Sequence, residues 1–268
     1  MPDRPHPPLP AVVLAGERVS PSPLATAFSV AAGVLVPVAG RPSIARVFTA
    51  LRASRMVQGG RLCGPDRSVI SGSPALQALL APGDFTWVAP QAGPAASVVA
   101  SLEALGRFPT LVTTGDHALL RPETIDDFCR QALRRDEDVL VGLVPYETVM
   151  DAFPETHRTA LRFAGDVCWC GSNLFLFRTA EGLKAANFWR QVESMRKKPW
   201  KIARHLGLTM LARYLTHRLT LEQALADISR RAGCRVGYVV LSDPRAAVDV
   251  DSVADQALAE RLLESDPA

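Results

Sequence analysis

The chain has 268 residues, of which 48% are hydrophobic and 21% charged, so it can bury a full core and its size fits one domain. Its 30 Lys and Arg and 27 Asp and Glu residues are spread along the sequence and leave a formal net charge of +3, which excludes the dense basic face of a nucleic-acid-binding protein. The least polar run, residues 30–40, is interrupted by Gly33 and Pro37 and is shorter than the roughly 20 residues of a membrane span. We therefore expect neither a nucleic-acid partner nor a membrane segment.

The amino-terminal residues 1–10 are rich in proline and contain no apolar run of the kind found in a signal peptide. We expect a short disordered arm there, followed by one folded domain over residues 11–268. The five cysteines are an odd set, which favours reduced thiols in a cytoplasmic protein over a disulfide framework. Cys168 and Cys170 are spaced as C-x-C without a second pair, so buried thiols are favoured and a zinc site is the open alternative.

Short apolar, β-branched runs alternate along the chain with longer amphipathic segments. This alternation is typical of an α/β fold with a parallel sheet and helices on both faces. Residues 11–15 predict a buried first strand, and residues 42–54 predict a helix because their apolar side chains recur at helical spacing. Further strands are predicted at residues 61–63, 85–88, 111–114, 139–144, 174–177 and 236–241, with helices at residues 95–105 and 122–134.

From residue 198 onward the pattern predicts consecutive helices before the last strands. Thr220 and Gln223 have the spacing of a capping box that begins a helix, and Gly233 is placed to end it. Two such helices could be a DNA-binding helix-turn-helix. No basic cluster decorates the second helix, so a packing role is favoured.

The first candidate site follows the first strand, where Leu14, Ala15 and Gly16 lead into a loop rich in Ser, Pro and Ala. A buried strand that ends in glycine exposes backbone N–H groups at the carboxyl edge of the sheet, where phosphates bind. An ordinary exit from strand to loop has the same local sequence, so this segment alone does not decide between the two.

The second candidate is Asp116, which follows Gly115 at the end of a predicted strand. A carboxylate at this edge can hold a divalent metal that bridges phosphates, and a helix cap or turn residue is the alternative. The third is the pair Asp249 and Asp251, expected on one face of a strand because side chains alternate. Two aligned carboxylates repel each other, and a cation would relieve the repulsion.

These segments, in this order, resemble the MobA-like NTP transferase family, of which the chain would be a divergent member. The family has a Leu-Ala-Gly loop, a Lys-x-Leu-x-Pro-Val-x-Gly-Arg-Pro element, a Gly-Asp-x-x-Leu-Leu strand end and a closing Asp-x-Asp-Thr. The counterparts here are residues 14–16, 35–42, 115–120 and 249–252. The resemblance implies a single Rossmann-like three-layer α/β/α domain with a mostly parallel sheet, of the GT-A-like nucleotidyltransferase kind.

The same resemblance implies an enzyme that transfers a nucleotidyl group from an NTP to a phosphorylated or sugar-like acceptor, with release of pyrophosphate. Its partners would be an NTP and a small phosphorylated acceptor. Its cofactor would be Mg²⁺, held by Asp116 and Asp251. Asp251 is preferred to Asp249 because it directly precedes Ser252, which matches the family's Asp-Thr.

Further site residues follow from the resemblance. Gly93 and Ser97 lie in a loop that resembles the nucleobase side, and Asn173, like Arg158, lies in elements that resemble the acceptor side. Two catalytic cations are expected. Lys201 shares one face of a predicted helix with Lys197 and Arg204, where a phosphate cradle and a solvated basic face are equally compatible with the pattern. The other is Arg18, in the first loop.

One departure from the family pattern concerns charge. Gly33 stands where the family usually has a Lys that neutralises the triphosphate, and Glu17 and Arg18 replace the usual Gly-x-Gly-x-Arg. The alternative function is therefore a family member that binds a nucleotide or sugar phosphate without transfer. A glycosyltransferase is a third possibility because Asp249-Val-Asp251 imitates the Asp-x-Asp of those enzymes, but its place near the carboxyl terminus argues against it.

Overall fold

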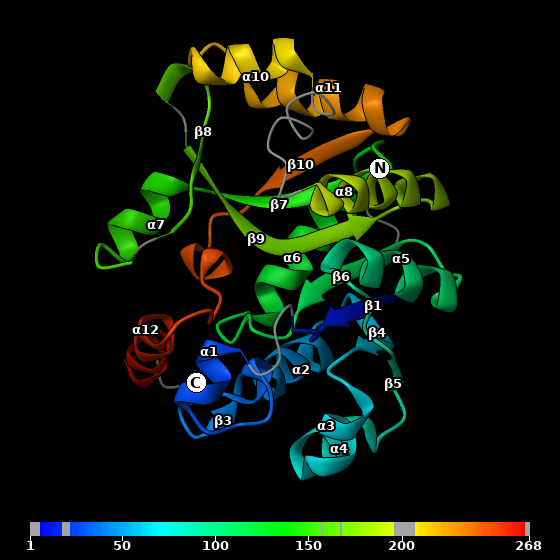
Figure 1. Ribbon diagram of the computed structural model, residues 1–268, viewed down its shortest axis with the longest axis vertical. Helices are drawn as coiled ribbons and strands as arrows, with labels where there is room; N and C mark the ends of the chain where they lie inside the picture. The colour runs from blue at the N-terminus through cyan, green and yellow to red at the C-terminus, as the bar shows by residue number, and fades with distance from the viewer. Residues whose placement is uncertain (1–5, 18–21, 157, 167, 196–206, 266–268) are drawn as a thin grey trace.

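A mixed, mostly parallel sheet forms the centre of the molecule, and helices cover both of its faces (Figure 1). The computed structural model describes residues 6–17, 22–156, 158–166, 168–195 and 207–265. The sheet has eight strands, in the order β10-β7-β9-β6-β1-β4-β5, with β8 paired to β9. Their bounds are β1 Leu9–Leu14, β4 Val57–Cys63, β5 Phe85–Val88, β6 Thr110–Thr114, β7 Val139–Pro145, β8 Leu161–Arg162, β9 Cys168–Phe177 and β10 Val236–Val240. A separate hairpin pairs β2 (Pro37–Val38) with β3 (Arg41–Pro42).

The helices form the two outer layers. The described helices are α1 Pro23–Ala27, α2 Ser43–Ala53, α3 Arg67–Gly72, α4 Pro74–Leu80, α5 Pro94–Leu105, α6 Pro122–Leu133, α7 Tyr146–Ala152, α8 Leu183–Ser194, α10 Leu208–Leu215, α11 Leu221–Ala232 and α12 Val253–Glu264. Short 3₁₀ turns are η1 Gly33–Leu35, η2 Ala164–Asp166, η3 Ala180–Gly182 and η4 Pro244–Ala247. α2 and α6 bury their apolar faces against one side of the sheet, and α5 and α8 pack on the other (Figure 1).

Side chains of β1 alternate between these two layers. Val13 belongs to the core beneath α2 and α6, whereas Val12 belongs to the core beneath α5 and α8. A strand buried on both faces needs apolar residues at every position, which explains the continuous run of β1. The expected three-layer α/β fold with a mostly parallel sheet is therefore confirmed. β9 is the exception to the parallel order, because it pairs antiparallel with both β6 and β7.

The strand order identifies where the chain reverses direction across the sheet. From β1 the chain adds β4 and then β5 on one side, and β6 then returns to pair with the other side of β1. All these pairs are parallel, so the loops after β1 and β6 emerge at the same carboxyl edge. Ligands of open α/β sheets bind at such a switch point.

Most predicted elements are present within a few residues of their expected bounds. In α11, Thr220 and Gln223 form the predicted capping box, and Gly233 ends the helix with a φ of 75°. Two predictions were wrong. Leu9 and Pro10, expected in the arm, belong to β1, and Leu9 is buried. The segment around Asp249 and Asp251 is not a strand but an irregular turn between η4 and α12.

Two further expectations concern cysteines and membranes. The five cysteines are free thiols, and all are buried except Cys168, which is partly exposed. Searched over the described ranges, the helices are too short or too polar to cross a lipid bilayer.

The close approach of β4 to β1 requires glycine at one position. Gly60 has a φ of +150°, and a Cβ atom there would lie 1.7 Å from the carbonyl oxygen of Ala11 in β1. We predict that Gly60→Ala lowers the free energy of unfolding by about 3 kcal/mol or more, because the strands must separate locally. Urea denaturation measures the change.

The matched control for this prediction is Gly72→Ala at the end of α3. No atom lies within 4 Å of a Cβ built on Gly72, and its φ is ordinary. We expect this variant to be as stable as the wild type or more stable by up to about 1 kcal/mol. Equal urea midpoints for the two variants would contradict the described approach of β1 and β4.

Candidate functional site

The two loops at the switch point emerge side by side. The last residue of β1, Leu14, accepts a hydrogen bond through its carbonyl from Gly115 N at 2.8 Å, and Ala15 N donates to the Cys63 carbonyl at 2.8 Å. Gly16 follows at the exposed edge. Val34 of η1 packs closely against Gly115. A Cβ atom on Gly115 would lie 3.2 Å from Val34 Cγ1, so a residue without a side chain fits best there. The predicted neighbourhood of residues 14–16 and Asp116 is therefore present.

Asp116 is joined to the turn of residues 249–251, far along the chain. Val250 N donates to the backbone carbonyl of Asp116 at 3.0 Å. Two further contacts fix the approach of these segments, His117 Nε2 to the Arg245 carbonyl at 3.3 Å and Thr124 Oγ1 to Asp243 Oδ2 at 2.6 Å. Asp116 and the Asp249-Val-Asp251 turn therefore meet in space, and the metal site expected at Asp116 and Asp251 stays a prediction.

Several carboxylates share this partly buried edge. The pKa of Asp116 is raised to about 7, chiefly by burial and in part by the charges of Asp249 and Asp251, while a hydrogen bond from the Thr114 hydroxyl opposes the rise. Asp251 itself is exposed. A bound cation would relieve the repulsion between carboxylates that lie this close together.

The neighbouring His117 is a buried packing residue. Its side chain is only 1% exposed, and burial is the main cause that lowers its pKa, so the ring is neutral. Nδ1 has no hydrogen-bond partner. Within the described ranges, no group of three or more His, Cys, Asp or Glu side chains is arranged to hold a metal, which leaves the C-x-C zinc alternative without support.

The guanidinium of Arg158, a residue expected on the acceptor side, binds two aspartates. Arg158 donates through Nη1 to Asp249 Oδ1 and through Nη2 to Asp255 Oδ1, and Nη2 also lies 3.2 Å from the Asp249 carbonyl. Asn173 Nδ2 donates to Asp249 Oδ2 at 3.1 Å, and its φ of 53° turns the backbone of β9 at this point. Asp249 therefore has partners on both carboxylate oxygens.

Glu17 occupies the neighbourhood of Gly33. The Gly33 N–H donates to Glu17 Oε1, and a Cβ at Gly33 would lie 3.2 Å from that oxygen and 3.3 Å from Ser22 Oγ. A carboxylate thus sits on the backbone of the residue where a cation was expected. The two expected catalytic cations, Arg18 and Lys201, lie outside the described residues. The same holds for Lys197 and Arg204.

The loop expected on the nucleobase side begins α5. Gly93 is the N-cap residue of this helix and carries no capping side chain, while Pro94 opens the first turn. Ser97 is buried, and its Oγ accepts from Gln91 N at 2.9 Å, so its side chain holds the loop in shape. Glu193 Oε2 accepts from Ala95 N at 3.3 Å.

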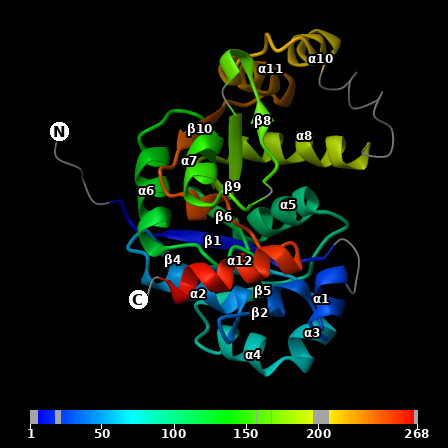
Figure 2. The same cartoon turned by 90° about the vertical axis from the view of Figure 1, so that its left-hand side faces the viewer.

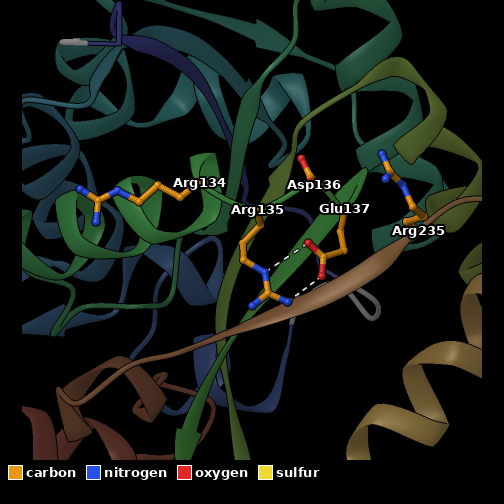
Figure 3. Close-up of a pocket in the computed structure, with 5 residues that line it drawn as sticks. All are labelled: Arg134, Arg135, Asp136, Glu137 and Arg235. Carbon is orange, nitrogen blue, oxygen red and sulfur yellow. Dashed lines mark hydrogen bonds and ion pairs between the residues drawn. The ribbon is translucent and has the colours of Figure 1, made fainter. Parts of the chain in front are cut away.

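A pocket of about 410 Å³ lies elsewhere, at the amino ends of β7 and β10 (Figure 3). Arg134, Arg135, Asp136, Glu137 and Arg235 line it. Arg135 donates to both oxygens of Glu137, at 2.6 and 3.2 Å, so the charges in the pocket are largely compensated. β7 runs parallel to β6, which places this pocket at the opposite edge of the sheet from Asp116.

A protein-family match covers the part of the chain that carries Asp116. A family described as the MobA-like NTP transferase domain matches residues 11–168, more than half of the chain. The chain belongs to this family. The matched part includes both switch-point loops and ends before Asn173 and the aspartate turn.

Solved structures extend the likeness over the rest of the chain. A hypothetical transferase from Thermus thermophilus is 28% identical, with a TM-score of 0.76 over 93% of this chain and 99% of its own. A CMP:2-keto-3-deoxy-manno-octonic acid synthetase in complex with CTP is 14% identical, with a TM-score of 0.59 over 97% and 99%. A 4-diphosphocytidyl-2C-methyl-D-erythritol synthase from Anaerococcus prevotii is 10% identical, with a TM-score of 0.58 over 96% and 98%. No curated protein sequence matches significantly.

Sequence reasoning missed Asp255, the second carboxylate that Arg158 binds. Asp255 was not singled out, because Ser252 and Asp255 have the spacing of a helix cap, and they do form one: Ser252 Oγ accepts from Asp255 N at 3.2 Å. No local signal shows that the same carboxylate also reaches Arg158. Asp249 is anchored through both of its carboxylate oxygens, and the preference for Asp251 as the metal ligand stays a prediction.

The anchoring of Asp249 predicts that the two Asn variants differ in stability in the absence of metal. Asp249→Asn should lower the free energy of unfolding by about 1–3 kcal/mol, because the guanidinium of Arg158, 9% exposed, loses a charged partner. Asp251→Asn should change it by no more than about 0.5 kcal/mol, because Asp251 is exposed and bears the same charge as Asp116. Urea denaturation in EDTA tests both variants, and equal losses of stability would contradict the described anchoring.

Proposed function

We propose that the protein is a metal-dependent nucleotidyltransferase that moves a nucleotidyl group from an NTP to a phosphorylated or sugar-like acceptor and releases pyrophosphate. The observation that carries the proposal is the meeting of Asp116 with the turn that bears Asp251, beside the Leu14-Ala15-Gly16 loop at the switch point. Membership of an NTP transferase family supports the same reaction class.

The residues present fit a magnesium ion. Mg²⁺ is bound through one or two protein carboxylates together with phosphate oxygens and water, so Asp116 and Asp251 suffice. The pKa of Asp116 is raised chiefly by burial and in part by the charges of Asp249 and Asp251, and a cation would relieve the repulsion between these carboxylates. Bound Mg²⁺ would supply neutralisation of phosphate charge during transfer.

The chain's own groups would act mainly by positioning. Backbone N–H groups around Gly16 would bind phosphate oxygens, and the loop held by Ser97 would position the base. Asn173 would keep Asp249 in place on the acceptor side. Arg18 and Lys201 would add positive charge around the pyrophosphate, which stabilises a leaving group as its charge develops.

The structurally similar proteins suggest which nucleotide to test first. One neighbour is a synthetase in complex with CTP, and another is a diphosphocytidyl-methylerythritol synthase. We therefore place CTP first in the binding experiments, followed by the other common NTPs.

The metal site is tested by removing its carboxylates. Asp116→Asn and Asp251→Asn should each abolish Mg²⁺-dependent binding of the preferred NTP while preserving side-chain volume. Isothermal titration with and without Mg²⁺ measures binding, and a coupled assay measures pyrophosphate release. Asp127→Asn is the matched control, because Asp127 is an exposed residue of α6 that pairs within its own helix, with Arg130. Wild-type binding by both site variants would refute the metal site and the transferase proposal together.

A second candidate is a family member that binds a nucleotide or sugar phosphate without transfer. The observation that favours it is the Glu17 carboxylate on the Gly33 N–H, since a negative charge there repels a triphosphate. In this case the wild type would bind a nucleotide or sugar phosphate and release no pyrophosphate.

Substitutions at Glu17 and Gly33 distinguish the two candidate functions. Glu17→Gln with Gly33→Lys should raise NTP affinity by about 10- to 100-fold, the value of a partly desolvated Lys–phosphate contact. Gly33→Lys alone should gain less, because the new ammonium can pair with Glu17. Glu103→Gln, an exposed carboxylate of α5, controls for net charge. Pyrophosphate release by the double variant alone supports the second candidate, and release by the wild type overturns it.

A further inference from the structure

Arg158 is buried to an extent that is unusual for a cation meant to bind substrate. Its side chain is 9% exposed, against 25% for Asp249 and 17% for Asp255. It lies in the segment between α7 and β8, which the sequence resemblance assigned to the acceptor side.

The donors of Arg158 are almost all engaged. A guanidinium has five N–H donors. Nε donates to Thr156 Oγ1 at 3.1 Å, Nη1 donates to Asp249 Oδ1, and Nη2 serves both the Asp249 carbonyl and Asp255 Oδ1. At most one N–H remains for another ligand, and an anionic acceptor would have to displace a carboxylate to reach more.

The turn held by Arg158 is the one that meets Asp116. Arg158 binds both the side chain and the backbone carbonyl of Asp249, and Asn173 binds the other carboxylate oxygen. The next residue, Val250, donates to the Asp116 carbonyl. Arg158 therefore fixes the residue immediately before the contact that brings the two halves of the candidate metal site together.

The same guanidinium also ties the turn to the carboxyl-terminal helix. Asp255 lies in the first turn of α12, which packs beside β2 (Figure 2). Gln256 Nε2 donates to the Pro37 carbonyl at 2.8 Å. The start of α12 is thus held from two sides, by Arg158 and by the β2 strand.

We propose that Arg158 is a positioning residue, which holds the Asp249–Asp251 turn against Asp116 and is not a cation that binds the acceptor. The inference rests on the proposed function for its catalytic meaning. The contact that it explains, Val250 N–H to Asp116 O, can be measured without any ligand.

The experiment compares variants by hydrogen exchange at the Val250 amide in the full chain. Arg158→Lys keeps the charge and loses the fork, and Arg158→Gln loses both. Asp255→Asn frees one arm of the fork while keeping Arg158 and Asp249, so it remains informative if Arg158→Gln does not fold. Arg261→Gln is the matched control, because it breaks an exposed ion pair between α12 and Glu155, 2.9 Å long, without touching Asp249.

We expect Val250 exchange to be about tenfold faster or more in both Arg158 variants, intermediate in Asp255→Asn and unchanged in Arg261→Gln. Titration of the preferred NTP with Mg²⁺, without acceptor, should show about 10- to 100-fold weaker binding for Arg158→Lys, the usual effect of losing a partner behind a metal ligand. Binding of inorganic phosphate alone, a probe for a phosphorylated acceptor, should not change.

Two results would overturn the inference. One is Val250 exchange at the wild-type rate in both Arg158 variants. The other is loss of inorganic phosphate binding with unchanged NTP binding, which would make Arg158 an acceptor cation. If the wild type binds no NTP at all, the proposed function fails, and Val250 exchange still decides the role of Arg158.

Discussion

The hydrogen bond from the Val250 N–H to the Asp116 carbonyl is the contact on which the candidate site depends. It joins the loop after β6 to a turn that follows the last strand of the sheet, so the site exists only after the whole chain has folded. The same bond holds Asp116 near Asp249 and Asp251 at a partly buried edge, where burial, with a smaller contribution from these two charges, raises the pKa of Asp116 to about 7. The fold thus holds the carboxylates of Asp116, Asp249 and Asp251 close enough to repel one another.

The fold itself was largely readable from the sequence, because its signals are local. Continuous apolar runs predicted strands buried on both faces, and the cap residues of α11 predicted both ends of that helix. The turn around Asp249 shows where local signals fail. Its alternation of apolar and acidic residues is that of a strand, yet the segment is irregular, and Arg158 and Asn173 bind Asp249. Alternation describes side-chain direction and says nothing about a backbone partner.

The site was readable only in part for the same reason. Asp116 and Asp251 could be selected because each occupies a recognisable place in the sequence. Only Asp116 follows a parallel strand, and its meeting with the turn of residues 249–251 depends on the backbone bond from Val250. The contacts of Glu17 with Gly33 and of Arg158 with Asp255 join residues with no shared motif or spacing. Such pairs depend on tertiary packing, so a single sequence gives no signal for them. The positive φ of Asn173, which brings its amide to Asp249, is equally invisible in the sequence.

The balance of charge at this edge constrains what the site can bind. Glu17, Asp116, Asp249 and Asp251 all contribute carboxylates, and the guanidinium of Arg158 is already shared between Asp249 and Asp255. A triphosphate approaching this arrangement meets negative charge, and at short range in a partly desolvated site that repulsion exceeds what one hydrogen bond returns. Binding of a nucleotide therefore requires added positive charge. A divalent cation held by Asp116 and Asp251, as proposed above, would supply this charge beside the carboxylates that repel one another.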